Sequence, residues 1–251
     1  KNILLHAIEN TQKYKSIILQ GDNPVNWLQN FPILNKKDIR NNPDNLISKK
    51  SNKTKLIPYS SSGSTGVQTS VYMTKKEQSI IRAILTHWWE WSGYQIGNPI
   101  AQTGITPNRS FLKQLKDSLF RTIYINAFSH SEEQLAKLCK KLEKKKNKFY
   151  IAGYASSLNV IAEYALNKKI DIHLKSAISF GDKLFDHYKM NIKKAFYCNV
   201  FDTYGCNEGF LIASQKDLEY KYIMSPHVYL EILDDNNKAV NDGEIGNVVV
   251  T

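Results

Sequence analysis

The sequence predicts an α/β fold in which layered parallel β-sheets are flanked by helices, because short apolar segments alternate with helical patterns through its middle. Each apolar segment has the length of a buried strand and leads into a turn that contains glycine. These units are 149–152 before Gly153, 177–180 before Gly181, and 200–202 before Tyr204 and Gly205. Ligands of parallel sheets bind beyond the carboxyl ends of the strands, so the turns predict a site at one edge of the sheet.

An amphipathic helix is predicted upstream, over residues 78–91. Its apolar side carries Ile80, Ile81, Ile84, Leu85 and Trp88. We interpret the three tryptophans at positions 88, 89 and 91 as packing residues of this helix rather than as a substrate cage.

The end of the chain carries two β-like segments, 228–233 and 246–251, on either side of a polar turn at 234–237. We therefore expect one domain over residues 1–220. Residues 221–251 are expected to begin a β-rich subdomain that is cut short.

Length and composition bound the class of protein. The 251 residues, of which 42% are hydrophobic, suffice for a sizeable core, which predicts a globular protein. No segment approaches the roughly 18 apolar residues of a membrane helix, and the start lacks the features of a signal peptide. We expect a cytoplasmic protein without a membrane span. Cys139, Cys198 and Cys206 show no C-x-x-C spacing and predict reduced thiols.

The formal charge of +11 comes mainly from lysine. Among 34 basic residues, the arginines, which favour phosphate and base recognition, are Arg40, Arg82, Arg109 and Arg121. The densest lysine cluster lies at 137–148, in a segment where Leu135, Leu138, Cys139 and Leu142 recur at helical spacing. This pattern predicts a solvated helix face, and we expect no specific nucleic-acid binding.

Residues 59–66, Tyr-Ser-Ser-Ser-Gly-Ser-Thr-Gly, offer many hydroxyls and closely approachable backbone amides. This run predicts a loop for nucleotide phosphates. It lacks the lysine and the following helix of a Walker A loop, and it leads into an alternating segment at 69–74 that predicts a strand.

A second motif follows the strand at 200–202. Tyr204 can stack on a purine, and Glu208 can hold Mg²⁺ beside phosphate oxygens. Together with residues 59–66, this motif suggests that ATP is used at its α-phosphate. Taken alone, Tyr204 also fits a core aromatic, and Glu208 also fits an exposed helix start.

These two motifs resemble the phosphate loop and the Y-G-x-T-E motif of the adenylate-forming superfamily, most closely the phenylacetate-CoA ligase type and its capsular-polysaccharide-biosynthesis relatives. Further similar segments follow in the family's order: 31–39 to L-P-I-L-T-K-x-D/E-L, 153–158 to G-Y-P-S-x-L, 179–184 to S-G-E-x-L, and 243–251 to G-E-x-G with a V-V-x-T strand. The resemblance spans almost the whole chain and implies the large N-terminal domain of such an enzyme.

The resemblance implies a two-step reaction. A small-molecule carboxylate attacks the α-phosphate of Mg-ATP to give an acyl-adenylate and pyrophosphate, and an acceptor such as the thiol of CoA, an amine or another nucleophile then takes the acyl group. The resemblance also makes a homodimer an expectation, because relatives often dimerise.

The family's site residues carry over to matching positions. Glu208 would ligate Mg²⁺ and, with Thr65, would be catalytic. The nucleotide would be bound by Ser61, Ser62, Gly63, Ser64, Thr65, Gly66, Gly181, Asp182, Tyr204, Gly205 and Asn207. The acyl side would be lined by Gly153, Tyr154 and Ser156. Tyr154, Trp88 and Phe128 fit either a pocket wall or the core.

The sequence departs from the family at several positions. Val67 and Gln68 stand where relatives commonly have Lys-Pro, and Asn207 replaces a hydroxyl residue. Where some relatives bind zinc, this sequence has Ser214, Gln215 and Tyr222, so we expect no zinc. The C-terminal lid domain with its adenylation lysine is not in the sequence. We therefore expect a fragment that binds nucleotide weakly and adenylates poorly.

Three other functions stay open at this point. An acyl-protein synthetase would differ in its acceptor alone. A non-catalytic relative would bind ATP without carboxylate-dependent pyrophosphate exchange. A basic nucleic-acid-binding module would show a steep salt dependence of oligonucleotide binding.

Overall fold

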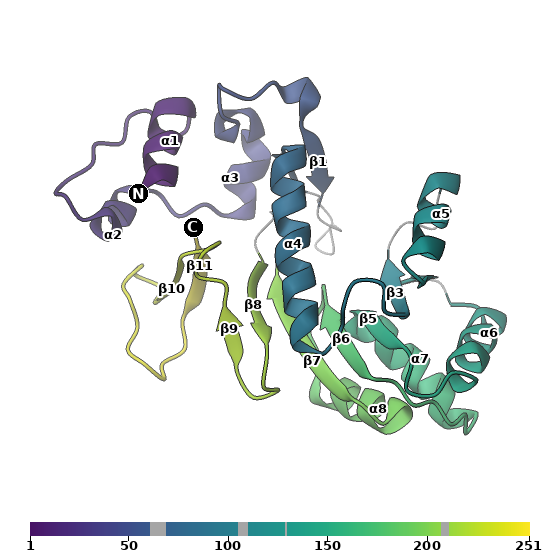
Figure 1. Cartoon of the computed structure of the whole chain (residues 1–251). Coiled ribbons are helices and arrows are strands. Elements are labelled where there is room, and N and C mark those ends of the chain that lie inside the picture. Colours follow the sequence, from purple (N-terminus) through teal and green to yellow (C-terminus); the bar gives the residue numbers. More distant parts are fainter. Residues whose placement is uncertain (61–68, 105–109, 129, 207–210) are drawn as a thin grey trace. The chain divides into compact units, whose positions relative to one another are not determined.

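The computed structural model describes residues 1–60, 69–104, 110–128, 130–206 and 211–251 (Figure 1). Among the described residues, two compact units are distinguished. The first contains 1–81 and 231–249, and the second contains 82–206, 211–230 and 250–251. Each unit is described by itself. The division expected at residue 220 stays a prediction.

The second unit is built on a seven-stranded sheet with the strand order β4-β3-β5-β6-β7-β8-β9. Strands β4 through β7 of this order pair in parallel, and β8 and β9 extend the sheet in antiparallel fashion. The strands are β3 (Ile100–Gly104), β4 (Thr122–Asn126), β5 (Tyr150–Tyr154), β6 (Ser176–Phe180), β7 (Asn199–Gly205), β8 (Leu211–Gln215) and β9 (Lys221–Ile223). The predicted α/β class with a parallel sheet flanked by helices is confirmed.

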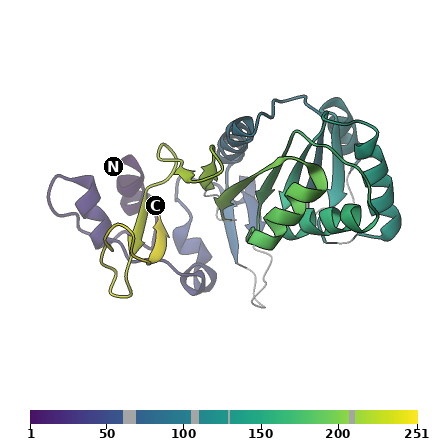
Figure 2. The same ribbon diagram turned by 90° about the horizontal axis from the view of Figure 1, so that it is seen from below.

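Three of the described helices cover one face of this sheet, and the main hydrophobic core lies between them and the strands. They are α6 (Glu132–Glu143), α7 (Ala155–Asn167) and α8 (Asp186–Phe196), and Figure 2 shows the green α8 lying along the strands. Their apolar sides pack with Ala101, Ile151, Ala177 and Val200 of the strands. Because side chains alternate along a strand, the neighbouring residues Tyr150, Ala152 and Ile178 face the opposite side, where they cluster with Trp89 and Tyr94. The sheet is thus buried on both faces, as parallel sheets require.

The helix boundaries follow from local chemistry. Ser131 and Gln134 form a capping box at the start of α6, and Lys140 and Lys141 lie in its last turn, where the helix dipole favours cations. Leu135, Leu138, Cys139 and Leu142 are all buried, so the predicted lysine-rich outer face of this helix is confirmed.

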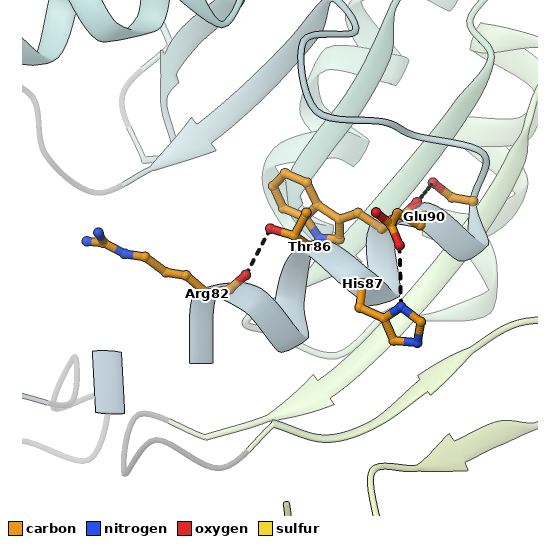
Figure 3. A network of polar contacts seen from close by, with 6 residues as sticks. Arg82, Thr86, His87 and Glu90 are labelled. Atoms are coloured by element: carbon orange, nitrogen blue, oxygen red, sulfur yellow. Dashed lines mark hydrogen bonds and ion pairs between the residues drawn. The ribbon is translucent and has the colours of Figure 1, made fainter. Parts of the chain in front are cut away.

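Helix α4 (Lys75–Trp91) begins three residues before the predicted start, at a reciprocal cap between Thr74 and Glu77. Trp88 and Trp89 are buried, in agreement with the predicted packing role. Figure 3 shows polar contacts between residues of this helix. The Thr86 hydroxyl donates to the Arg82 carbonyl, and His87 Nδ1 lies 3.3 Å from the Glu90 carboxylate.

The helix α5 (Phe111–Leu119), between β3 and β4, differs from the others. Its side chains Phe111, Leu112, Leu115 and Leu119 are exposed and share one side of the helix, which therefore contributes little to the core of this unit.

The first unit contains short helices and two small sheets. The helical segments are α1 (Asn2–Asn10), α2 (Pro24–Trp27), η1 (Leu28–Asn30), α3 (Lys36–Asn41), η2 (Pro43–Leu46) and η3 (Lys53–Lys55). The sheets pair β1 (Ile57–Ser60) with β2 (Ser70–Met73), and β10 (Leu230–Leu233) with β11 (Asn247–Val250). The strand predicted within 69–74 and the terminal β-pair are both confirmed.

Candidate functional site

The predicted motif turns follow neighbouring strands at the same level of the sheet. Gly153 of β5 lies opposite Ser179 of β6, and Ser179 lies opposite Asp202 of β7. The three strands therefore end at about the same level, and the described turns after β5 and β6 leave the sheet at the carboxyl ends of these strands (Figure 1). This is the edge at which doubly wound sheets bind ligands.

The side chain of Asp182 lies at the start of α7. Its Oδ1 accepts a hydrogen bond from the Ala155 amide at 2.5 Å, and its Oδ2 accepts one from the Ser156 amide at 3.1 Å. The first amides of a helix have no partner within the helix, and a carboxylate there is also favoured by the helix dipole. Asp182 thus joins the turn after β6 to the helix after β5. Each carboxylate oxygen keeps one further lone pair, so the exposed Asp182 can accept an additional hydrogen bond while it caps α7.

Two glycines allow the turns to approach closely. Gly181 has φ +84°, and a Cβ on it would lie 2.5 Å from Cε1 of Tyr154. A Cβ on Gly153 would overlap the side chain of Thr103, a β3 residue that is 1% exposed and whose Oγ1 accepts from the Tyr154 amide at 3.1 Å. Both glycines are therefore required by packing, whatever else they contact.

Tyr154 is the centre of an aromatic row. Its ring centroid lies 5.2 Å from that of Phe128 and 5.6 Å from that of Phe180. Burial, with a smaller contribution from Asp182, raises the pKa of Tyr154 above its usual value, so its hydroxyl stays protonated at neutral pH. From the sequence, Trp88 and Phe128 could each belong to the core or to a pocket wall. Trp88 is 2% exposed and belongs to the core, whereas Phe128 is 67% exposed.

The end of β7 presents Tyr204, which is 45% exposed, next to a shift of register at Gly205. An exposed ring at this edge is available for stacking. In the same strand, Asp202 pairs with Lys221 of β9 at 2.6 Å, although its side chain is only 14% exposed. This ion pair, whose lysine side chain is 40% exposed, was not anticipated from the sequence, because its partners lie on strands that are not consecutive.

A histidine that the sequence analysis did not single out also lies at this edge. His130 follows β4, and its Nε2 is 3.0 Å from the Ser157 hydroxyl in the first turn of α7. Burial lowers the pKa of His130, against the opposing effect of a hydrogen bond to the Ala127 backbone, so the ring is neutral at pH 7.

Several predicted residues lie outside the described part of the chain: Ser61, Ser62, Gly63, Ser64, Thr65, Gly66, Asn207 and Glu208. The described stems of the first segment are Ser60 and Ser70, which are paired across β1 and β2 with their hydroxyls 2.9 Å apart. In the described ranges, no group of three His, Cys, Asp or Glu side chains could hold a metal ion. Within the same ranges, no helix has the length and apolar character needed to cross a membrane.

Comparison with curated proteins gives one relative in sequence. Protein CapK of Staphylococcus aureus is 31% identical over 220 residues, a region that covers 80% of this chain and 47% of CapK. No family model matches the chain.

Solved structures share the fold over all or most of the chain. An open conformation of 2-hydroxyisobutyryl-CoA ligase, in complex with 2-HIB-AMP and CoA, aligns with a TM-score of 0.76 at 16% identity, over 100% of this chain and 58% of that one. ATP-bound MatB of Rhodopseudomonas palustris aligns at 0.55 and 13% identity over 82% of this chain and 41% of its own. The amide bond synthetase McbA of Marinactinospora thermotolerans aligns at 0.54 and 14% identity, over 81% and 43%.

The fold is that of the N-terminal domain of the adenylate-forming ligases, which confirms the resemblance seen in the motifs. In sequence the chain is similar to Protein CapK, which supports the predicted resemblance to the capsular branch. The chain spans about half the length of the proteins it matches, from 41% of MatB to 58% of the hydroxyisobutyryl-CoA ligase.

Proposed function

We propose that the protein activates a carboxylic acid with ATP as an acyl-adenylate, releases pyrophosphate, and transfers the acyl group to the thiol of CoA or to another nucleophile. The observation that carries the proposal is the register of the sheet, which sets Gly153, Ser179 and Asp202 side by side. The motif segments that follow these residues would then meet at the carboxyl ends of the strands, in a fold of which one solved member holds an acyl-adenylate with CoA and another holds ATP.

In this reaction the chain contributes position and charge neutralisation rather than covalent chemistry. The hydroxyls and amides of residues 61–66 would bind the β- and γ-phosphates. The exposed ring of Tyr204 offers a face for adenine, and Tyr154 and Ser156 would border the acid. Asp182 holds the first turn of α7 in place beside the acid.

A magnesium ion would be held by Glu208 together with phosphate oxygens of the nucleotide. One carboxylate beside phosphates suits Mg²⁺, which keeps several of its waters, and the described residues offer no competing cluster of acidic or imidazole ligands. When bound, the ion supplies neutralisation of phosphate charge.

The proposals for the acyl acceptor and for the pathway are based on the proteins that this chain resembles. A thiol acceptor is suggested by the CoA ligases, and an amine acceptor by the amide bond synthetase McbA. An acyl-protein synthetase would carry out the same activation and would transfer the acyl group to a protein. We propose a role in capsule or surface-glycan modification on the similarity to CapK.

The test is ATP–pyrophosphate exchange by the full-length protein across a panel of aryl, fatty, hydroxy and amino acids. Exchange that depends on one acid and falls at least ~100-fold in Glu208→Gln is expected. Glu219→Gln, an exposed carboxylate in the turn between β8 and β9, is the matched control and should keep full activity. Unchanged exchange in Glu208→Gln would overturn the magnesium assignment. A folded protein that binds ATP without exchange on any acid would be a non-catalytic relative.

A further inference from the structure

The turn after β4 brings a phenylalanine ring to the site edge and keeps it exposed. Phe128 is 67% exposed, and its ring contact within the described residues is with Tyr154. Full burial of such a ring would be worth roughly 1.5–3 kcal/mol, and most of that surface is left open here.

The backbone around Phe128 is held at several points, so its exposure is built into the turn. The Ala127 amide donates to the Gly104 carbonyl at 2.9 Å, and Ala127 itself is 4% exposed. The Phe128 amide donates to Oδ1 of Asn126 at 3.3 Å. These contacts tie the turn to the carboxyl ends of β3 and β4.

On the C-terminal side of Phe128, His130 is hydrogen-bonded to helix α7. Its Nε2 lies 3.0 Å from Oγ of Ser157, which is 2% exposed and lies in the first turn of α7. The same turn of α7 is held by Asp182 through the amides of Ala155 and Ser156. Phe128 and Tyr154 therefore flank a helix start that two loops fix in position.

The aromatic contacts run in a row from the core to the surface. Trp89 stacks on Phe180 at 6.3 Å, Phe180 contacts Tyr154 at 5.6 Å, and Tyr154 contacts Phe128 at 5.2 Å. Trp89 is buried in the second core cluster, whereas Phe128 is the exposed end of the row. An apolar group placed against Phe128 would extend this row by one member.

We propose that Phe128 is a specificity-determining residue that receives an apolar acyl group, aromatic or aliphatic, and that His130, bonded to Ser157, is the positioning residue that holds its turn. The inference rests on the proposed acyl-activating function and narrows its substrate class. It assigns no chemical step to His130, because both sides of the imidazole are used by Ser157 and by the backbone of Ala127.

The test compares acid selectivity in the full-length protein by ATP–pyrophosphate exchange. In Phe128→Ala, kcat/KM for the bulkiest accepted acid should fall about tenfold relative to its shortest accepted homologue, the size expected for apolar contacts in a specificity site. The KM for ATP should stay within about twofold of its original value. Phe111→Ala, which removes another exposed phenylalanine on α5, should leave the ratio unchanged.

The role of His130 is tested by the same selectivity ratio, kcat/KM for the bulkiest accepted acid over kcat/KM for its shortest accepted homologue. His130→Ala should shift the selectivity in the same direction as Phe128→Ala, and His130→Gln, which can still hydrogen-bond to Ser157, should restore most of it. Loss of activity on all acids alike, without rescue by glutamine, would make His130 a residue of general stability and would overturn its positioning role. If His130→Ala does not fold, the glutamine variant decides its role by the same ratio, and the exposed Phe128→Ala still decides the specificity claim.

The outcomes separate the two proposals. Exchange by the unaltered protein with an unchanged selectivity ratio in Phe128→Ala would overturn the specificity claim and leave the function intact. The absence of exchange in the unaltered protein on every acid would overturn the proposed function, and the specificity claim with it.

Discussion

Asp182 and Ala155 are joined by a hydrogen bond of 2.5 Å between residues that stand 27 positions apart in the sequence. With the second bond to the Ser156 amide, the carboxylate caps helix α7 from a neighbouring turn, in place of the N-cap residue Tyr154, whose side chain makes no capping bond. The helix predicted to border the acid is thus fixed by a residue of the turn predicted to border the nucleotide.

Removing this cap should weaken the fold. We expect Asp182→Ala to lower the free energy of unfolding by about 1 kcal/mol, and Asp182→Asn by less, because the amide oxygen can still accept one bond. Urea denaturation followed by circular dichroism measures the change. Lys183→Ala, at the adjacent exposed position, serves as control. Equal stability of Asp182→Ala and the control would show that the cap contributes nothing.

Gly181 should tolerate substitution less well than Gly97. Both have positive φ, +84° and +92°, but a Cβ on Gly97 meets nothing within 4 Å, whereas one on Gly181 meets the Tyr154 ring. Gly97→Ala therefore isolates the backbone strain, about 1 kcal/mol. Gly181→Ala should cost at least ~1 kcal/mol more, because the Tyr154 ring is held between Phe128 and Phe180. Equal losses in thermal unfolding would contradict the packing argument.

The cysteines should differ sharply in reactivity. Burial raises the pKa of Cys139 to about 11 and that of Cys198 to about 12, so at pH 8 very little of either thiol is ionised, whereas Cys206 is exposed. A thiol reagent at pH 8 should modify Cys206 rapidly and the other two after denaturation. Cys206→Ser should abolish the rapid phase. Three equal rates would rule out the burial of Cys139 and Cys198.

Acid should weaken an ion pair at the opposite end of α7. The pKa of Asp171 is lowered first by its hydrogen bond to Lys146 and further by His173. A depressed folded-state pKa stabilises the protein above the unfolded value near 4, and this contribution is lost as the pH falls through the folded value. Between pH 6 and 2, Asp171→Asn should therefore show a shallower fall in melting temperature than the unaltered protein. A parallel fall in both would contradict the prediction.

The phosphate-loop assignment makes its own prediction. Ser64→Ala combined with Thr65→Ala should raise the dissociation constant for ATP about a hundredfold or more, because each hydroxyl bond to a charged phosphate contributes roughly 1.5–3 kcal/mol. Isothermal titration calorimetry measures the affinity, and Ser16→Ala, an exposed serine far from the loop in sequence, is the control. Unchanged affinity would remove residues 61–66 from the nucleotide site.

The fold could be predicted from the sequence where periodicity is strong. The parallel units around Gly153, Gly181 and Gly205, the helix with Leu135 to Leu142 inside, and the buried Trp88 all follow from the alternation of apolar and polar residues. Helix α4 was predicted to begin at residue 78, three residues after its actual start at Lys75. Its first turn is polar and is stabilised by a local cap between Thr74 and Glu77 rather than by the core.

The side-chain pairings of the site could not be predicted. Asp182 with Ala155, His130 with Ser157, and Asp202 with Lys221 each join segments whose proximity depends on strand order, which periodicity does not specify. The motif positions Gly153 and Gly181 were identified from the sequence. The structure adds why each must be glycine, because a Cβ there would clash with Thr103 or Tyr154.

The separation between core and site edge has a consequence for how such proteins diverge. Both hydrophobic clusters lie on the faces of the sheet, whereas the exposed Phe128 belongs to neither cluster, so its side chain can change without a cost in core packing. The same scaffold persists at 16% identity with the hydroxyisobutyryl-CoA ligase. Position 128 can therefore vary among proteins of this fold while both hydrophobic clusters stay packed.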